Sequence, residues 1–439
     1  MSELLERHRA VLPAWLALYY DSPLEIVSGR GRRVQDADGV SYLDFFGGIL
    51  TNMLGYDIPE VREAVERRLR TGVVHTSTLY LIRSQVELAE KVARLSGIPD
   101  AKVFFTNSGT EANETALLLA THARRSDQVL ALRNSYHGRS YAATAVTGSR
   151  SWKNSSLSPL NVHYLHGTDR ERFPQLSDQE YARFCVEDLR SCLATATATD
   201  VACLLVEPIQ GVGGFTAVPD GLLREYKQVL DEHGILLISD EVQTGWGRTG
   251  ETFWGIGAHG VTPDAMTFAK GLGNGLAIGG VVARGDLMDG LPANGISTFG
   301  GNPLATAAAN ATIDYLLDHE LQANAHRIGG RLIAGLRAAA EKLPTVGAVR
   351  GKGLMFAVDM VDPETGQPSP ALAATVLEEA RKHRLLIGKG GLHGNALRMA
   401  PPLTLTDGEA EEGLAALIEA LETVDRADRT DRADRTDPR

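Results

Sequence analysis

Two residues, Asp240 and Lys270, carry the strongest chemical signal in this chain. Lys270 follows the apolar run Thr267-Phe268-Ala269 and precedes a glycine-rich stretch, so we expect its amine to lose hydration. Loss of hydration favours the neutral amine, which is a nucleophile toward carbonyl groups. Asp240 ends an apolar strand predicted over 235–238, where a carboxylate can hold a protonated ring nitrogen.

Such a pair suits an enzyme of pyridoxal phosphate (PLP), in which a lysine forms a Schiff base and an acid keeps the pyridinium charged. A lone lysine is usually a solvated surface charge, and an aspartate at a strand end is often a cap or a turn residue. The interpretation therefore depends on three further features: a phosphate cradle, an aromatic side chain for the ring, and arginines for substrate carboxylates.

A phosphate cradle is predicted directly after the strand at 103–106. The segment 107–120 begins Asn-Ser-Gly-Thr and continues as a good helix, so its free amides and helix dipole point at one spot near Gly109 and Thr110. An ordinary helix cap, with Ser108 or Asn107 capping, explains the same residues and stays open here. The chain has no P-loop or dinucleotide fingerprint.

An aromatic residue and an arginine follow the strand predicted at 128–132. Tyr136 lies where ligands of such sheets bind, and its flat ring can stack on a flat cofactor, with His137 beside it as a further cofactor contact. Arg139 can bind a substrate carboxylate through its two-pronged guanidinium. The alternatives are a rim aromatic for Tyr136 and a surface salt bridge for Arg139.

Composition excludes several classes of protein. The 439 residues suggest two or three domains, and a net charge of −11 argues against a nucleic-acid partner. No apolar run is long enough to span a bilayer, and the N-terminus has no signal-peptide core. The three cysteines have neither zinc nor redox spacing, so we expect a cytoplasmic protein without a metal site.

The element pattern predicts an α/β fold with a mostly parallel sheet. An amphipathic helix is expected over 3–20, a strand–turn–strand over 34–46 and helices over 59–98. Apolar strands then alternate with helices to about residue 290, which is typical of a parallel sheet covered on both faces. A second α+β unit follows Asn302, and the repeated tail 426–439 is expected to be disordered or a frayed helical extension.

Taken together, these motifs resemble the class III, or ω-amino-acid, aminotransferases of PLP fold type I, the aspartate aminotransferase-like fold. The resemblance covers roughly residues 20–425, and it includes Ser239-Asp240-Glu241-Val242-Gln243 ahead of Ala269-Lys270-Gly271. It implies an N-terminal segment, 1–58, that joins a small α+β domain at 301–425. Between them, residues 59–300 would form the large PLP-binding domain, ahead of the tail at 426–439.

The same resemblance assigns the cofactor residues. Lys270 would carry PLP and later move a proton, Asp240 would hold the pyridine nitrogen, and Gly109 and Thr110 would bind the phosphate. Three more positions complete the cofactor set: Val242 on the ring face opposite Tyr136, Gln243 near the phenolic oxygen, and Thr298 at the phosphate of the neighbouring subunit. This implies a homodimer with a shared active site and leaves a tetramer open.

Substrate residues are also implied by the resemblance. Arg398 would bind the carboxylate of the keto acid, and Glu207 would pair with Arg398 when the amino donor has none. Arg139 would bind a distal carboxylate, Ile49 would form a pocket wall, and Tyr80 would line the same region.

The branch most similar includes alanine–glyoxylate aminotransferase 2, β-alanine–pyruvate and 4-aminobutyrate aminotransferases. We therefore expect ping-pong transfer from an ω-amino acid (β-alanine, 3-aminoisobutyrate or 4-aminobutyrate) to pyruvate, glyoxylate or 2-oxoglutarate. Two alternatives stay open, a PLP phospho-lyase acting on a phosphorylated amino alcohol and a catalytically silent binding protein. One departure from the common pattern is Gly55-Tyr56, where many members have Gly-His.

Overall fold

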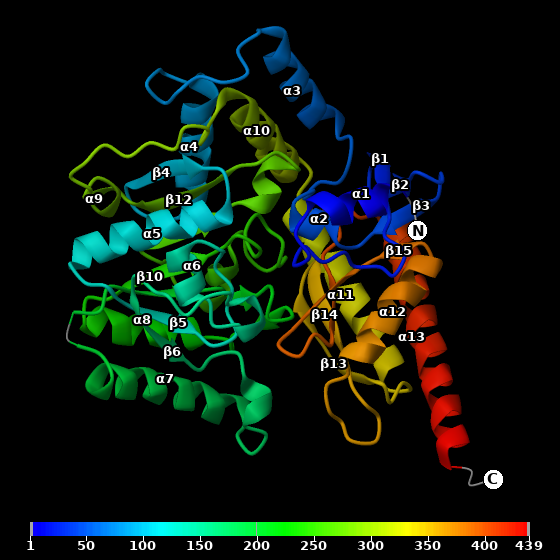
Figure 1. The fold of residues 1–439 in the computed structure, drawn as a ribbon. Coiled ribbons are helices and arrows are strands. Elements are labelled where there is room, and N and C mark those ends of the chain that lie inside the picture. Colours follow the sequence, from blue (N-terminus) through cyan, green and yellow to red (C-terminus); the bar gives the residue numbers. More distant parts are fainter. Residues whose placement is uncertain (1–2, 199, 437–439) are drawn as a thin grey trace.

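The computed structural model describes residues 3–198 and 200–436, which form two bodies (Figure 1). The larger body surrounds a seven-stranded sheet, and the smaller one combines the N-terminal strands with the C-terminal elements. The α-helices are α1 (Glu3–Val11), α2 (Gly47–Leu50), α3 (Pro59–Arg70), α4 (Arg83–Ser96), α5 (Gly109–Arg124), α6 (Tyr141–Val146), α7 (Asp178–Thr195), α8 (Leu222–Glu232), α9 (Gly285–Met288), α10 (Pro303–Asp318), α11 (Leu321–Ala340), α12 (Pro370–Lys382) and α13 (Asp407–Thr436).

The strands are β1 (Ile26–Arg30), β2 (Arg33–Asp36), β3 (Ser41–Asp44), β4 (Ala101–Thr106), β5 (Gln128–Leu132), β6 (Asn161–Leu165), β7 (Cys203–Val206), β8 (Ile209–Gln210), β9 (Thr216–Ala217), β10 (Leu236–Asp240), β11 (Ala265–Phe268), β12 (Gly279–Arg284), β13 (Val346–Lys352), β14 (Met355–Met360), β15 (Leu385–Leu386), β16 (Gly388–Gly390) and β17 (Ala396–Met399). Short 3₁₀ helices cover Arg150–Trp152, Arg170–Arg172, Gly255–His259 and Lys270–Gly273.

The seven-stranded sheet has the order β4-β12-β11-β10-β7-β5-β6. Its strands run parallel except β12, which is antiparallel to both neighbours. Every residue of β5, β7, β10 and β11 is buried, as expected for strands whose two faces are both covered by helices. The prediction of an α/β fold with a mostly parallel sheet is therefore confirmed.

The carboxyl ends of the parallel strands define where a ligand can bind. β4, β5, β7 and β10 end at Thr106, Leu132, Val206 and Asp240, at one edge of the sheet. β12 runs the opposite way and begins at this edge, because its first residue pairs with the last residue of β4. In open α/β sheets ligands bind outside the carboxyl ends of the strands, so this edge is the expected place for the site.

The smaller body contains two four-stranded sheets, β1-β2-β3-β15 and β13-β14-β17-β16. β3 and β15 pair in parallel, with Leu43 opposite Leu385, so the first strands and the C-terminal part of the chain share one sheet. In the second sheet, Arg398 of β17 pairs with Ala357 of β14.

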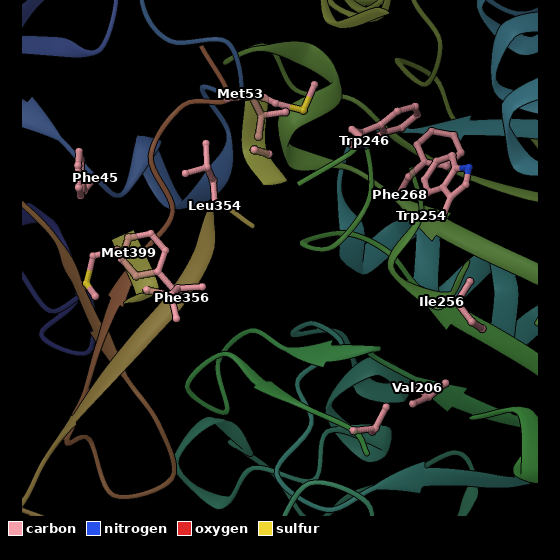
Figure 2. Close-up of a cluster of buried hydrophobic side chains, with 14 of the residues drawn as sticks. Phe45, Met53, Val206, Trp246, Trp254, Ile256, Phe268, Leu354, Phe356 and Met399 are labelled. Atoms are coloured by element: carbon pink, nitrogen blue, oxygen red, sulfur yellow. The ribbon is translucent and has the colours of Figure 1, made fainter. Parts of the chain in front are cut away.

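A large apolar core supports both bodies (Figure 2). In the larger body Trp246 packs with ring centroids 4.6 Å from Trp254 and 5.7 Å from Phe268. In the smaller body Phe356 and Met399 lie together (Figure 2) and are fully buried. Closely packed interiors resist small displacements, so these clusters fix the positions of the segments that meet at the sheet edge.

The helices at the two ends of the chain can be compared with the predictions from the sequence. The helix expected over 3–20 ends at Val11, because Pro13 disfavours helical backbone at the residue before it. Of the two alternatives for the tail, the structure has the helical one as far as Thr436, in α13; residues 437–439 lie outside the described part. Within the described ranges, no helix has the length and apolar character needed to cross a membrane.

Candidate active site

A cavity of about 410 Å³ opens at the carboxyl edge of the large sheet. Its walls combine the segments that follow β4, β5, β7, β10 and β11 with the turn that leads into β12. The predicted residues that line it are Gly109, Thr110, Tyr136, His137, Glu207, Asp240, Val242, Gln243 and Lys270. The structure thus brings nine of the fourteen predicted site residues to one cavity.

Asp240 is held by a buried hydrogen-bond network. Its Oδ2 atom lies 2.8 Å from His137 Nδ1 and accepts a hydrogen bond of 2.8 Å from Asn113 Nδ2. Oδ1 accepts from the backbone N–H of Val242 at 3.1 Å. Thr267 Oγ1 donates to Asn113 Oδ1 at 2.7 Å, which fixes the orientation of that amide. The carboxylate therefore has one defined orientation toward the cavity.

Lys270 sits where the chain leaves β11, and it adopts a left-handed backbone conformation with φ 45°. Non-glycine residues rarely take this conformation, and when they do it is often at a functional site. Burial lowers the pKa of the Lys270 amine, and the positive charge of Arg398 lowers it further. The carboxylates of Asp240 and Glu207 oppose this shift. The net direction favours the neutral amine that a nucleophile needs.

The start of α5 has the helix cap that the sequence left open as an alternative, and the same turn lines the cavity. Ser108 is the N-cap, and its side chain accepts a hydrogen bond from the backbone N–H of Glu111 at 3.2 Å. Gly109 and Thr110 occupy the first helical turn, where amides have no partner within the helix. Both residues line the cavity, so the same turn that is capped also presents donors and a hydroxyl to an anion.

Close backbone approach in the cradle requires glycine at two positions. A Cβ atom on Gly138 would lie 2.6 Å from Thr110 Oγ1, and this residue has φ +134°. A Cβ atom on Gly109 would lie 3.1 Å from the methyl groups of Val242. Glycine at these positions thus lets the segment after β5 and the side chain of Val242 pack directly against the start of α5.

Three polar or aromatic groups face the remaining cavity. Tyr136 packs edge-on against Trp152, with centroids 5.3 Å apart, and Val242 lies among the residues on the cavity wall. Among the described residues, Gln243 Oε1 and His137 Nε2 are buried without a hydrogen-bond partner. Buried polar atoms are normally paired, so these two atoms indicate a missing polar ligand.

Glu207 is oriented by the backbone and not by an arginine. Its Oε1 atom accepts from Tyr136 N at 2.8 Å, and its Oε2 atom accepts from Gly211 N at 2.9 Å. Burial raises the pKa of this carboxyl to about 7. Within the described ranges Glu207 and Arg398 form no ion pair, and each oxygen of the carboxylate accepts from a backbone amide.

Arg398 lies behind the cavity wall and is 4 % exposed. It donates to the carbonyl oxygens of Gly211 and Lys389 at 3.0 and 2.9 Å, and its guanidinium lies 5.2 Å from the centroid of Phe46 and 5.5 Å from that of Phe215. No carboxylate pairs with it among the described residues, and its Nε atom has no partner there. Burial lowers the pKa of the guanidinium.

The remaining four predicted residues lie outside the cavity wall in this single chain. Arg139 is exposed, with its guanidinium 5.4 Å from the centroid of Trp15. Ile49 and Tyr80 are 48 % and 70 % exposed, and Thr298 is exposed as well. Their predicted roles stay predictions, as do all individual role assignments and the division of the chain into four segments.

Sequence reasoning missed several cavity residues. Asn113 lies four positions after Gly109, one helical turn further on the same face, and that spacing could have identified it. Thr51 also lines the cavity and gave no signal in the sequence. Gly275, Leu276, Ala277 and Ile278 also line the cavity. The sequence indicated a glycine-rich segment after Lys270 but did not single out these residues.

The donor set fits PLP. An oriented carboxylate, a lysine with a lowered pKa, an anion cradle and two unpartnered polar atoms surround one cavity with an aromatic ring at its side. These are the groups needed at the ring nitrogen, the aldehyde carbon, the phosphate and the ring face of that cofactor.

Comparison with known proteins agrees with this geometry. The chain is 37% identical over 95% of its length to an Arabidopsis thaliana alanine–glyoxylate aminotransferase 2 homolog, covering 86% of that protein. It is 35% identical to the 5-aminovalerate aminotransferase DavT of Pseudomonas putida, over 95% of this chain and 97% of that protein. A phospholyase from Arthrobacter, solved in complex with phosphoethanolamine, superposes with a TM-score of 0.88 at 32% identity, over 96% of this chain and all of that one.

The match to a family spans nearly the whole described chain. Residues 18–421 match the family described as Aminotransferase class-III. With PLP fold type I architecture and a site suited to the cofactor, the chain belongs to the class III aminotransferases, which are PLP-dependent enzymes.

Proposed function

We propose that this enzyme transfers an amino group from an ω-amino acid to a 2-oxo acid in a ping-pong reaction. β-Alanine, 3-aminoisobutyrate and 4-aminobutyrate are the donors we favour, with pyruvate, glyoxylate or 2-oxoglutarate as acceptor. The observation that carries the proposal is Arg398, a buried guanidinium that has no acidic partner among the described residues. A buried charge needs a counter-charge, and the carboxylate of a 2-oxo acid supplies one with matching geometry.

PLP, when bound, supplies an electron sink for the carbon from which a proton is removed. The residues would divide the remaining work. Asp240 keeps a proton on the ring nitrogen, Gly109 and Thr110 bind the phosphate, and Tyr136 and Val242 pack on the two ring faces. The neutral Nζ of Lys270 would take a proton from the substrate carbon and deliver it to the cofactor, so that the amino group stays behind when the oxo product leaves.

Glu207 would adjust the charge near Arg398 as the enzyme alternates between its two substrates. An ω-amino donor carries no carboxylate on its reacting carbon, whereas the 2-oxo acid does. With the pKa of Glu207 raised to about 7, a small change in its surroundings changes its charge near neutral pH. Glu207 would turn from the amides of Tyr136 and Gly211 to neutralise Arg398 in the first half-reaction, and release it in the second.

The distal end of the donor would meet Arg139. This arginine is exposed beside Trp15, at the outer end of the segment that also carries Tyr136. A charge in that position favours donors with a carboxylate remote from the amine over simple amines. Ile49 and Tyr80 would form the walls between this arginine and the reacting carbon.

A homodimer with a shared site completes the proposal, with a tetramer left open. Large apolar side chains gather in exposed segments near Thr298 and Tyr80: Leu79 is 76 % exposed, Leu81 98 % and Phe299 59 %. Exposed apolar groups in such number mark an interaction surface. Burying these segments against a second copy would bring Thr298 to the phosphate of the neighbouring subunit. A cytoplasmic location is proposed with it.

The test is a half-reaction screen on the PLP-loaded enzyme. Each donor is mixed with the enzyme without acceptor, and the absorbance of the bound cofactor is followed as it converts to the amine form. The proposal expects conversion with an ω-amino acid and reversal by a 2-oxo acid. Failure of every amino-acid donor to convert the cofactor would contradict it.

A second candidate is a phospho-lyase, which the likeness to the Arthrobacter phospholyase favours. Such an enzyme shares the cofactor residues and differs in the substrate pocket. O-Phosphoethanolamine and a phosphate assay distinguish the two, because only the lyase releases phosphate without needing a 2-oxo acid. An enzyme that binds PLP but converts nothing would instead be a silent member of the family.

A further inference from the structure

The short element α2, between β3 and α3, is a left-handed turn and not a regular α-helix. Four consecutive residues, Gly47, Gly48, Ile49 and Leu50, have φ values of 55°, 64°, 66° and 64°. Left-handed backbone suits glycine, but it is disfavoured for ordinary residues and most of all for a β-branched one such as Ile49. A run of this kind persists only where its surroundings hold it in place.

This turn leads directly to the substrate side of the active site. Thr51, the next residue, lines the cavity, and its hydroxyl donates to Gly48 O at 2.8 Å. Phe46, the residue before the turn, lies 5.2 Å below the guanidinium of Arg398. A shift of the turn would therefore move a cavity wall and the ring under Arg398 together.

One buried carboxylate anchors the beginning of the turn. Asp44 Oδ1 accepts from the backbone N–H groups of Phe46 and Gly47 at 2.8 and 3.0 Å. Asp44 is 5 % exposed, and no cation pairs with it among the described residues. Its other oxygen, Oδ2, accepts a hydrogen bond of 2.5 Å from the hydroxyl of Tyr56.

Tyr56 is itself held in place through its backbone and through its ring. Its backbone exchanges two hydrogen bonds with Gly31, of 2.7 and 2.8 Å. Its ring lies on Gly29 so closely that a Cβ atom there would come within 2.7 Å of the ring. The hydroxyl therefore has a defined position, and the carboxylate that it meets has little freedom to turn.

We propose that Tyr56, acting through Asp44, is a positioning residue that holds the left-handed turn at 47–50 and so sets the fit of substrates in the cavity. The part concerning substrates rests on the proposed function; the part concerning the turn does not. Tyr56 does not line the cavity, and its effect passes through Asp44 to two backbone amides.

The chain offers a matched control in Tyr42 and Asp36. Tyr42 donates to Asp36 Oδ2 at 2.9 Å, and Asp36 Oδ1 accepts from the backbone amides of Asp38 and Val40. This second unit has the same hydrogen-bond chemistry, and both aspartates are 5 % exposed, although Tyr42 is buried and Tyr56 half-buried. It holds the turn between β2 and β3, which does not line the active-site cavity.

The test compares Tyr56→Phe with Tyr42→Phe in the PLP-loaded enzyme. Hydrogen–deuterium exchange followed by mass spectrometry reports the two turns separately. Tyr56→Phe should speed exchange in peptides covering 45–52 and leave 36–40 unchanged, whereas Tyr42→Phe should do the reverse. Unchanged exchange at 45–52 in Tyr56→Phe would overturn the proposal, whatever the enzyme's substrates prove to be.

Kinetics supply the second measurement, with any donor and acceptor that the wild-type enzyme converts. Losing a hydrogen bond to a carboxylate should raise KM by about tenfold in Tyr56→Phe, with kcat within about twofold. Asp44→Asn is made in the enzyme that retains Tyr56. Its amide keeps an acceptor for the two backbone N–H groups and a donor for the tyrosine oxygen, so this variant should keep most of the wild-type affinity. A Tyr56→Phe enzyme with the KM values of Tyr42→Phe would also overturn the proposal. If the wild-type enzyme converts no substrate, the proposed function fails. The exchange measurement still decides whether Tyr56 holds the turn at 47–50.

Discussion

His137 Nδ1 and Asp240 Oδ2 lie 2.8 Å apart, and both side chains are buried at the edge of the large sheet. Asn113 donates to the same carboxylate oxygen, so one oxygen of Asp240 accepts two hydrogen bonds while the other accepts only from the amide of Val242. These hydrogen bonds fix the orientation of the carboxylate, as a partner for a protonated ring nitrogen requires.

Replacing His137 should therefore slow the reaction without emptying the site. A hydrogen bond to a charged group is worth about 1.5–3 kcal/mol, so His137→Phe should lower kcat by roughly tenfold to a hundredfold. Single-turnover kinetics on the PLP-loaded variant give this value. The matched control is His166→Phe, because His166 Nδ1 also lies 2.8 Å from a buried aspartate, Asp169, away from the cavity. A loss of equal size in both variants would contradict a role specific to the site.

Lys270→Ala should abolish turnover, because in the proposed mechanism Lys270 supplies both the nucleophile and the proton carrier. The expected loss in kcat is at least about 10⁴-fold, while PLP still binds through the cradle and Asp240. Turnover is measured with the best donor, and cofactor content by absorbance after gel filtration. Lys153→Ala, which removes a half-buried lysine outside the cavity wall, is the control and should retain activity. A Lys270→Ala enzyme of near-normal rate would refute the assignment.

Arg398→Lys should separate the two half-reactions. The variant keeps a positive charge but loses the two-pronged fit to a carboxylate, so kcat/KM for the 2-oxo acid should fall roughly thirtyfold or more. Conversion of a donor without a carboxylate on its reacting carbon should change by less than about threefold by the same reasoning. Stopped-flow absorbance measures both half-reactions on one enzyme preparation. Equal losses in both would show that Arg398 does not recognise the acceptor.

Glu207 should make the stability of the cofactor-free enzyme depend on pH. Burial raises its pKa from 4.5 to about 7, so the folded state binds more protons than the unfolded state between these values. The wild type therefore loses stability as pH rises from 4.5 to 7, by up to about 3 kcal/mol, and Glu207→Gln does not suffer this loss. In urea unfolding, the free energy of unfolding of Glu207→Gln relative to the wild type should be higher at pH 8 than at pH 5.

A control with the opposite sign is available in Glu180. This exposed residue closes a capping box with Ser177, whose hydrogen bonds lower its pKa. Its stabilisation is present above its unfolded pKa and is lost as pH falls, so Glu180→Gln should be less stable than the wild type at pH 8. If Glu207→Gln behaved like Glu180→Gln, the carboxyl of Glu207 would not have a raised pKa.

Leu81→Asp should weaken the proposed homodimer. The side chain is 98 % exposed in the single chain, and a carboxylate in its place would be buried without a partner at an apolar interface. Analytical ultracentrifugation should show the dimer dissociating at concentrations where the wild type stays assembled. Leu157→Asp, at a 65 % exposed leucine outside the proposed interface segments, should leave assembly unchanged. Loss of activity together with dissociation would support a shared site.

The local features of this enzyme could be predicted because they depend on neighbours in sequence. The start of α5 follows from a strand, a Ser-Gly-Thr turn and good helix formers, and the buried strands β5 and β10 follow from continuous apolar runs. Lys270 and Asp240 could be placed at strand ends by the same reasoning. The sequence by itself therefore determined the parallel α/β sheet, the cradle and the lysine–acid pair.

Other features were decided only by contacts between distant segments. Asp240 meets His137 across 103 positions, and the carboxylate of Glu207 is held by the amide of Tyr136 across 71. The left-handed turn at Ile49 opposes the local preference of a β-branched residue, and the tertiary structure maintains it through Asp44 and Tyr56. A hydrogen bond between remote residues leaves no periodic trace in the sequence, so the orientation of the acid groups and the shape of the substrate side required the folded chain.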